Sequence, residues 1–260
     1  MKDFKKYKLI AFDLDKTLTI SKSPLDSEMA KLLNQLLAQK KVAIISGGNF
    51  PQFEVQVIQI VSNENKNPNF SNFFICATMG AKMFEFKNES WINFFEEKLS
   101  EIDRKKIIEA IKKGLEEFGF DDKNEPKFGE RIEDRGTQVT FSALGQLAPP
   151  DLKSSWDPDR SKKLKLKSLV EKYIPEFEVK VGGSTSIDIT KKGINKGFAV
   201  QNLCKHLGIE ISEVFFIGDE LKENGNDYAV KLIGVDCYET ESVEDTKRVI
   251  REILESEKLK

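Results

Sequence analysis

Two carboxylates one residue apart follow a short apolar run near the start of the chain. Residues 9–12 are apolar, and Asp13 and Asp15 come directly after them. Apolar runs of this length are typical of buried strands, and open α/β sheets bind ligands just outside the carboxyl ends of their strands. Because residues i and i+2 of a strand share one side, we expect both carboxylates at the edge of a sheet.

This pair of residue types suits phosphoryl transfer. Mg²⁺ prefers one or two carboxylates together with water and phosphate oxygens, and aspartate is a known covalent nucleophile that forms an aspartyl-phosphate. A nucleophilic Asp13 with an acid/base Asp15 fits this chemistry. Taken alone, two aspartates after a strand are more typical of a solvated turn, so the interpretation depends on the other strand ends.

Phosphate-binding groups follow a second apolar run. Ser46, Gly47 and Gly48 come after residues 41–45. Glycine permits close approach of the backbone, so the hydroxyl and these backbone N–H groups could hold phosphate oxygens. Lys196 opens a predicted helix after a glycine turn. Its ammonium could offset negative charge on a phosphoryl group and on the nucleophile.

Further acidic residues follow the apolar run 214–217. Asp219 could supply the second carboxylate to a metal ion, which completes a predicted metal set of Asp13, Asp15 and Asp219. Thr17, Glu220, Asn226 and Asp227 are candidates to orient the metal-bound water or Lys196. Each group alone is more typical of an ordinary turn or a solvated residue. Their combination, each at a strand end or a helix start, predicts a phosphoryl-transfer site.

The order of the expected elements indicates the fold. Strands and helices alternate in the first and last parts of the chain, which is typical of βαβ units with a parallel sheet. Residues 84–188 instead mix helices with alternating strands. We therefore expect an α/β protein, a Rossmann-like core of residues 1–83 and 189–260 with an inserted α+β domain of residues 84–188. The expected strands are 9–12, 41–45, 73–77, 138–143, 177–181, 185–189, 214–217 and 232–235; the expected helices are 27–39, 51–61, 93–118, 162–173, 196–207 and 245–254.

Composition excludes several classes of protein. The 41 Lys and Arg residues nearly balance the 43 Asp and Glu residues, whereas nucleic-acid binding requires a basic excess. Three scattered cysteines indicate a reducing compartment without a disulfide framework. The single histidine argues against histidine-based zinc sites. Neither a signal peptide nor a membrane-length apolar run is visible, so we expect a cytoplasmic protein that binds neither nucleic acid nor membrane.

The sequence resembles the haloacid dehalogenase superfamily. The resemblance rests on Asp13-Leu14-Asp15-Lys16-Thr17, on Ser46, on Lys196, and on Gly218-Asp219 followed by Asn226-Asp227. The position of the insert is similar to the C2 cap of subfamily IIB, the Cof-type branch, which holds sugar phosphatases and eukaryotic-type phosphomannomutases. The resemblance implies Mg²⁺ as cofactor, a phosphorylated sugar as substrate, and a homodimer formed through the cap.

Resemblance to the phosphomannomutases continues into the insert. It covers residues 132–135, 141–145 and 182–188. Arg135 presents a planar fork that matches a phosphate or a carboxylate, although an ion pair with Glu133 or Asp134 is the alternative. Ser186 and Asp188 are two residues apart on an expected strand and could contact sugar hydroxyls. With Lys22, these residues form the predicted substrate-binding set.

The chain departs from the family pattern at three positions. Lys16 replaces the usual glycine and adds positive charge beside the nucleophile. Phe128 and Gln146 stand where the mutases carry arginines for a distal phosphate. Because a mutase must retain a bisphosphate intermediate, we favour a phosphatase. A phosphomannomutase-like phosphotransferase is the alternative, and a catalytically inactive sugar-phosphate binding module is a third hypothesis that the intact motifs oppose.

Overall fold

The computed structural model describes residues 3–20, 23–223 and 225–258. The chain divides into two compact units, Met1–Glu96 with Asn195–Lys260, and Glu97–Ile194. The first contains a seven-stranded sheet in the order β11-β10-β1-β2-β3-β4-β5, and the second contains a four-stranded sheet in the order β6-β7-β9-β8. This arrangement confirms the predicted α/β fold class with a separate α+β unit.

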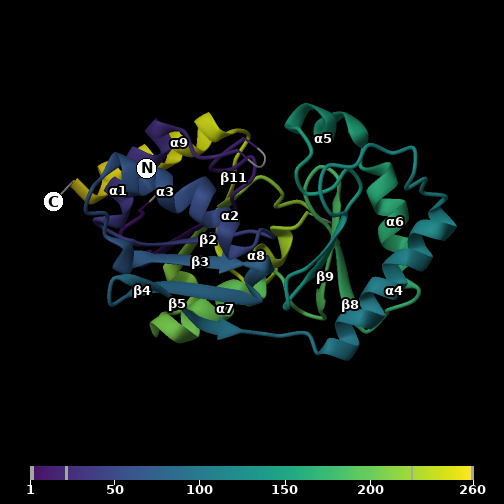
Figure 1. The fold of residues 1–260 in the computed structure, drawn as a ribbon. Helices are drawn as coiled ribbons and strands as arrows, with labels where there is room; N and C mark the ends of the chain where they lie inside the picture. Colours follow the sequence, from purple (N-terminus) through teal and green to yellow (C-terminus); the bar gives the residue numbers. More distant parts are fainter. Residues whose placement is uncertain (1–2, 21–22, 224, 259–260) are drawn as a thin grey trace. The chain divides into compact units, whose positions relative to one another are not determined.

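The first unit is a three-layer α/β structure. Strands β11, β10, β1, β2 and β3 run parallel, and β4 and β5 extend the sheet antiparallel. Helices α1, α3 and α9 pack on one face and α7 on the other (Figure 1). Its elements are β1 (Leu9–Phe12), α1 (Ser27–Leu37), β2 (Lys41–Ile45), α2 (Phe50–Phe53), a π-helical segment (Glu54–Ile58), α3 (Gln59–Glu64), β3 (Phe73–Ala77), β4 (Lys82–Lys87), β5 (Ser90–Glu96), α7 (Lys196–Leu207), β10 (Val214–Gly218), α8 (Tyr228–Leu232), β11 (Asp236–Glu239) and α9 (Val243–Lys258).

Successive side chains of β1 point to opposite faces of the sheet and pack against different helices. Ile10 and Phe12 belong to the apolar cluster under α1, α3 and α9, whereas Leu9 and Ala11 belong to the cluster under α7. All four are buried, as expected for a central strand of a parallel sheet that is covered on both faces. The residue after the strand continues this alternation, so Asp13 falls on the side of α7.

The second unit packs helices against one face of an antiparallel sheet. Apolar side chains of β7, β8 and β9 form a cluster with those of α4 and α6. Helix α4 has a capping box at Ser100 and Asp103 and ends at Gly119 in the left-handed conformation, both of which satisfy terminal backbone groups. The elements are α4 (Glu101–Phe118), β6 (Ile132–Asp134), β7 (Val139–Ser142), α5 (Pro150–Trp156), α6 (Ser161–Glu171), β8 (Phe177–Val181) and β9 (Ser186–Lys191).

The limits of the inserted unit differ from the expected 84 and 188. Strand β4 pairs with β3, and β5 pairs with β4, so the hairpin belongs to the first unit. The predicted helix 93–118 accordingly begins later, at Glu101. At the other end, β9 continues to Lys191 because it pairs with β8 through Phe177. Hydrogen bonds between strands distant in the sequence decide both limits.

The predicted strand 232–235 was wrong. Tyr228–Leu232 forms α8, Gly234 adopts a φ of +88°, and the strand follows at Asp236–Glu239. The apolar residues of this stretch therefore end a helix and form a turn, and the more polar residues that follow pair with β10. None of the helices that the structure describes combines the length and apolar character needed to cross a membrane.

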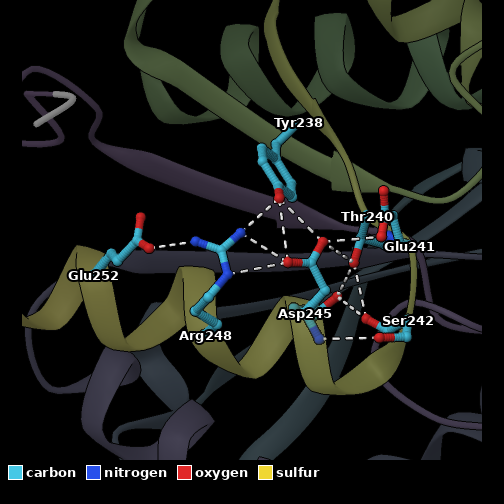
Figure 2. A network of polar contacts seen from close by, with 8 residues as sticks. Tyr238, Thr240, Glu241, Ser242, Asp245, Arg248 and Glu252 are labelled. Atoms are coloured by element: carbon cyan, nitrogen blue, oxygen red, sulfur yellow. Dashed lines mark hydrogen bonds and ion pairs between the residues drawn. The ribbon is translucent and has the colours of Figure 1, made fainter.

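A polar network ties the last strand of the sheet to the C-terminal helix (Figure 2). The Asp245 carboxylate accepts hydrogen bonds from the Tyr238 hydroxyl at 3.0 Å, from the Glu241 N–H at 3.2 Å and from Arg248 Nη2 at 2.7 Å. Arg248 also bonds the Tyr238 hydroxyl and pairs with Glu252. The carboxylate therefore links β11, the turn after it and the first turns of α9.

We predict that Asp245→Ala destabilises the first unit. Losing a charged acceptor that serves several donors should cost about 1–3 kcal/mol, measurable by urea unfolding, whereas Glu252→Gln at the exposed end of the network should cost under about 1 kcal/mol. Burial tends to raise the pKa of Asp245, but Arg248, the Glu241 N–H and Tyr238 lower it overall. Its stabilisation is thus present above the unfolded-state pKa and lost as the pH falls through the folded-state pKa. An unchanged difference between wild type and variant down to about pH 2 would contradict this assignment.

Candidate active site

A buried lysine between two buried carboxylates lies at the carboxyl edge of the parallel sheet. Lys196 Nζ is 2.6 Å from Asp13 Oδ1 and 2.6 Å from Asp227 Oδ1. The side chain of Lys196 is 1% exposed, that of Asp13 is 6% exposed and that of Asp227 is fully buried. Charges removed from water to this extent are stable only when they are paired. The structure therefore brings together three residues of the predicted site.

Local structure explains how these side chains meet. Asp13 follows β1 on the side of α7, and its N–H donates to the Ile217 carbonyl of β10 at 3.0 Å. Lys196 is the first residue of α7, whose start is capped by the Asn195 side chain through the Phe198 N–H. The helix start is thus set by an ordinary cap, and the lysine projects from it toward the end of β1.

Asp227 is placed by a glycine and a turn. A Cβ atom added to Gly218 would lie 2.3 Å from Asp227 Oδ2, so only glycine leaves room for this carboxylate at the end of β10. Asp227 Oδ2 accepts the Glu220 N–H at 3.0 Å, and Oδ1 accepts from Lys196. Both oxygens of Asp227 are therefore engaged, which suits a residue that orients Lys196, as predicted.

Electrostatic effects in the cluster are large. Burial raises the pKa of Asp13 well above its ordinary value, and Asp227 and Asp219 raise it further while Lys196 opposes them. Burial also raises the pKa of Asp219, with Asp227 acting in the same direction. Burial alone would lower the pKa of Lys196, but Asp13 and Asp227 raise it overall. The two carboxylates therefore favour the charged form of Lys196, whereas burial and the neighbouring carboxylates disfavour the charged forms of Asp13 and Asp219.

A set of carboxylate oxygens from Asp13, Asp219 and Asp227 lies within 4.8 Å of one another. This set contains Asp227 where the predicted set of Asp13, Asp15 and Asp219 contains Asp15. Asp15 lies in the turn after β1 and is half-buried. All donors are oxygens, which matches hard divalent cations such as Mg²⁺. Both oxygens of Asp227 already accept hydrogen bonds, from Lys196 and from the Glu220 N–H. Asp13 and Asp219 are therefore better candidates than Asp227 for binding a cation.

The predicted phosphate-binding loop follows β2. Ser46 is buried, and the Gly48 N–H points to its hydroxyl at 3.5 Å. Helix α2 begins at once, with a capping box between Asn49 and Gln52. A Cβ atom on Gly48 would lie 2.8 Å from Gln52 Oε1, so glycine allows the box to form at this turn. This box was not predicted, although its N-x-x-Q pattern could have indicated it.

A turn after β3 supports the same loop and was also missed. The Thr78 N–H donates to the Gly48 carbonyl and the Met79 N–H donates to the Ser46 carbonyl, both at 2.9 Å. Thr78, Met79 and Gly80 all have positive φ. Such strain in non-glycine residues persists only where the surroundings enforce it. A glycine shortly after an apolar run is the only sequence signal for this turn.

Two polar atoms in the loops after β1 and β10 lack hydrogen-bond partners among the described residues. They are Thr17 Oγ1 and Asn226 Oδ1, both buried. Asn226 donates its backbone N–H to Glu220 Oε2 at 3.3 Å, so it lies in the turn that positions Asp227. Buried acceptors without partners are uncommon, and both belong to residues predicted to orient groups of the site.

Three predicted substrate residues lie in the second unit. Arg135 Nη2 pairs with Glu133 at 2.7 Å, and its side chain is only 6% exposed. Ser186 and Asp188 lie on β9, as predicted. Asp188 accepts hydrogen bonds from Gln138 at 2.9 Å and from Thr140 at 2.7 Å, whereas Ser186 Oγ is buried without a described partner. The fourth predicted residue, Lys22, lies outside the described residues.

Comparisons with known proteins agree with the fold. Residues 10–229 match the family model of haloacid dehalogenase-like hydrolases. The chain is 23% identical to the phosphomannomutase of Saccharomyces cerevisiae over 94% of this chain and 93% of that protein, and 23% identical to that of Spinacia oleracea over 95% and 96%.

Solved structures share the fold. A C-terminally truncated IMP-nucleotidase of Plasmodium falciparum has a TM-score of 0.73 at 15% identity, covering 98% of this chain and 73% of that one. A haloacid dehalogenase-like hydrolase from Bacteroides thetaiotaomicron has a TM-score of 0.60 at 15% identity, covering 95% of this chain and 99% of that one.

Fold, site and relatives define an enzyme of phosphoryl transfer. The chain belongs to the haloacid dehalogenase-like hydrolases, and its sequence is similar to the phosphomannomutases within them. The predicted family resemblance is thereby confirmed.

We predict that Asp13→Asn abolishes turnover while leaving the fold intact. The variant removes one of the two carboxylate partners of buried Lys196 but keeps the ion pair with Asp227 at 2.6 Å, so Tm should fall while unfolding stays cooperative. Thermal unfolding and steady-state rates test both parts, with mass spectrometry to detect hydrolysis of the amide back to aspartate. Retained turnover in intact variant protein would remove Asp13 from the nucleophile role.

Proposed function

We propose that this protein is a Mg²⁺-dependent phosphatase that acts on a small phosphorylated sugar. The observation that carries the proposal is the buried Asp13–Lys196–Asp227 arrangement at the carboxyl edge of the sheet, with both ion-pair distances at 2.6 Å. Asp13 has a fixed position at a strand end, as a nucleophile requires. The family match and the phosphomannomutase relatives support the choice of phosphorylated sugars.

In the proposed reaction, a carboxylate oxygen of Asp13 attacks phosphorus and the ester bond to the sugar oxygen breaks. The resulting aspartyl-phosphate is then hydrolysed by water, which releases phosphate and regenerates the carboxylate. Lys196 has three donor hydrogens and is held by two carboxylates, so it can offset charge that develops on the phosphoryl oxygens. Ser46 and the N–H groups of Gly47 and Gly48 hold the remaining oxygens.

Asp15 is proposed as the acid and base. It donates a proton to the leaving sugar oxygen and later accepts one from the attacking water. Positioned proton transfer of this kind contributes roughly 10²–10⁴-fold to a rate. Its half-buried place in the turn directly after the nucleophile supports this role, and Thr17 is available to orient the turn.

A bound Mg²⁺ would neutralise charge between the nucleophile and the phosphoryl group. Asp13 and Asp219 would hold it, with Asp15 supplying oxygen from the same loop and Asn226 orienting water. The raised pKa of Asp13 and Asp219 is consistent with a site built to receive positive charge.

The alternative function is a phosphomannomutase-like phosphotransferase. Phe128 and Gln146, at the positions of two mutase arginines, lie close together, since the Phe128 N–H and carbonyl bond Leu144 and Leu147. The neighbouring Arg131 cannot replace those arginines, because it pairs with Asp122 and donates to four backbone carbonyls of the same unit. This observation favours hydrolysis over retention of a bisphosphate.

One assay separates the three hypotheses. A panel of hexose and pentose phosphates should be incubated with Mg²⁺, with and without a hexose bisphosphate, and both phosphate release and isomer formation measured. Phosphate release independent of the bisphosphate supports the phosphatase. Isomer formation that requires the bisphosphate would establish the mutase, and no turnover of any sugar phosphate or of p-nitrophenyl phosphate would indicate a binding module.

We predict that Asp219→Ala raises the Mg²⁺ concentration needed for half-maximal activity by at least about tenfold, the effect of roughly 1.4 kcal/mol. The KM for the phosphate ester should change less. Glu213→Ala is the matched control, because Glu213 precedes the opposite end of β10 and pairs with Lys8. Identical Mg²⁺ activation curves for Asp219→Ala and wild type would refute the metal role.

We predict that Arg135→Ala reduces activity on a sugar phosphate more than on p-nitrophenyl phosphate. A charged hydrogen bond is worth roughly 1.5–3 kcal/mol, or about a 10- to 150-fold loss in kcat/KM when the transition state uses it fully. Arg104→Ala is the control, since Arg104 pairs with Asp134 in the same unit. Equal losses for both substrates would mean that Arg135 serves only its ion pair with Glu133.

A further inference from the structure

Lys16 occupies a strained position in the turn after β1. Its φ is +63°, in the left-handed region that is costly for any residue with a Cβ atom. The Lys16 N–H donates to the Thr19 carbonyl at 2.7 Å, which closes the turn. Glycine would meet this requirement without cost. A lysine at such a position therefore points to a role for its side chain.

The turn exposes this side chain and buries its neighbours. Leu14, Thr17 and Leu18 are each at most 2% exposed, whereas Lys16 is exposed. Asp15, directly before it, is half-buried. The turn thus presents an ammonium group at the edge of the sheet that carries Asp13.

The negative charge at this edge of the sheet gives the Lys16 ammonium a role in binding an anionic substrate. Asp13, Asp219 and Asp227 cluster there, and Lys196 is buried between two of them. Before a cation binds, three carboxylates face one buried lysine at this edge, and a dianionic phosphate ester must approach that excess of negative charge. Lys16 is three residues after Asp13, in the turn that follows β1 and is closed by its N–H to the Thr19 carbonyl, so the same edge of the sheet carries both residues.

We propose that Lys16 is a substrate-binding residue whose ammonium attracts and contacts the phosphate oxygens of the incoming ester. The inference rests on the proposed phosphatase function and adds to it a residue that favours doubly charged phosphate monoesters. An exposed charge acts over several ångströms and is screened by salt. The contribution of Lys16 should therefore depend on ionic strength.

The test compares Lys16→Met, Lys16→Arg and wild type on p-nitrophenyl phosphate with Mg²⁺ at low and high salt. An ammonium about 5 Å from a dianion in a water-like medium changes binding by about 5- to 20-fold. Lys16→Met should lose that factor in kcat/KM at low salt, mainly through KM, and should show a flatter salt dependence. Lys16→Arg should retain at least about half of the wild-type kcat/KM at low salt, because it preserves the charge.

Lys16→Gly distinguishes the effect of the strained backbone on stability from the effect of the side chain on activity. Relief of the left-handed conformation should raise Tm by about 2–4 °C, while kcat/KM falls as in Lys16→Met. Glu89→Gly is the matched control, because Glu89 has a φ of +59° in the β4–β5 turn. Its Tm should also rise, with kcat/KM unchanged.

Lys16→Met activity within twofold of wild type at low salt, or equal salt dependence of the two proteins, would overturn the inference. Failure of the proposed phosphatase function gives different results, which are seen in the wild type. Wild type that hydrolyses the aryl phosphate but no sugar phosphate removes the proposed substrate and leaves Lys16 testable. If wild type hydrolyses neither, calorimetric titration with inorganic phosphate and Mg²⁺ decides, and equal affinities for wild type and Lys16→Met overturn the inference.

Discussion

The ion pairs of buried Lys196 with Asp13 and Asp227 are the constraint on which the rest of the first unit depends. A lysine removed from water in this way is strongly destabilising unless carboxylates pair with it. Those carboxylates come from the end of β1 and from the turn before α8, and the lysine comes from the start of α7. Two ion pairs of 2.6 Å therefore join three segments that are far apart in the sequence.

Close contacts and strained backbone conformations occur at the same edge of the sheet. Gly218 has no Cβ atom and so leaves room for Asp227 Oδ2. Thr78, Met79 and Lys16 adopt positive φ. The sheet beneath is conventional, with apolar strands buried on both faces. At the end of the sheet order, the network around Asp245 ties β11 to α9 (Figure 2). Such a scaffold can hold a strained site because its stability comes from elsewhere.

In the second unit, polar side chains bond mainly to one another and to the backbone. One face of its sheet packs on α4 and α6, while β7 and β9 carry hydrogen-bonding side chains on alternate positions, with Asp188 accepting from Gln138 and Thr140. Arg131 pairs with Asp122 and donates hydrogen bonds to backbone carbonyls, so its charge stabilises the unit. The proposed function assigns the chemistry to the first unit and the selection of substrate to the second.

The sequence by itself determined the class of fold and the class of chemistry, and it singled out Asp13, Lys196 and Asp219, because a strand end or a helix start is a local signal and each of these residues stands at one. It did not determine that Asp227 would join Asp13 and Asp219 while Asp15 lies in the adjoining turn, nor that β4 and β5 belong to the first unit. The strand at 236–239 and the strained turn at Thr78–Gly80 were likewise missed. Strand pairing, the position of a helix start against a strand end and positive φ are decided by contacts between distant segments, and only the tertiary structure contains them.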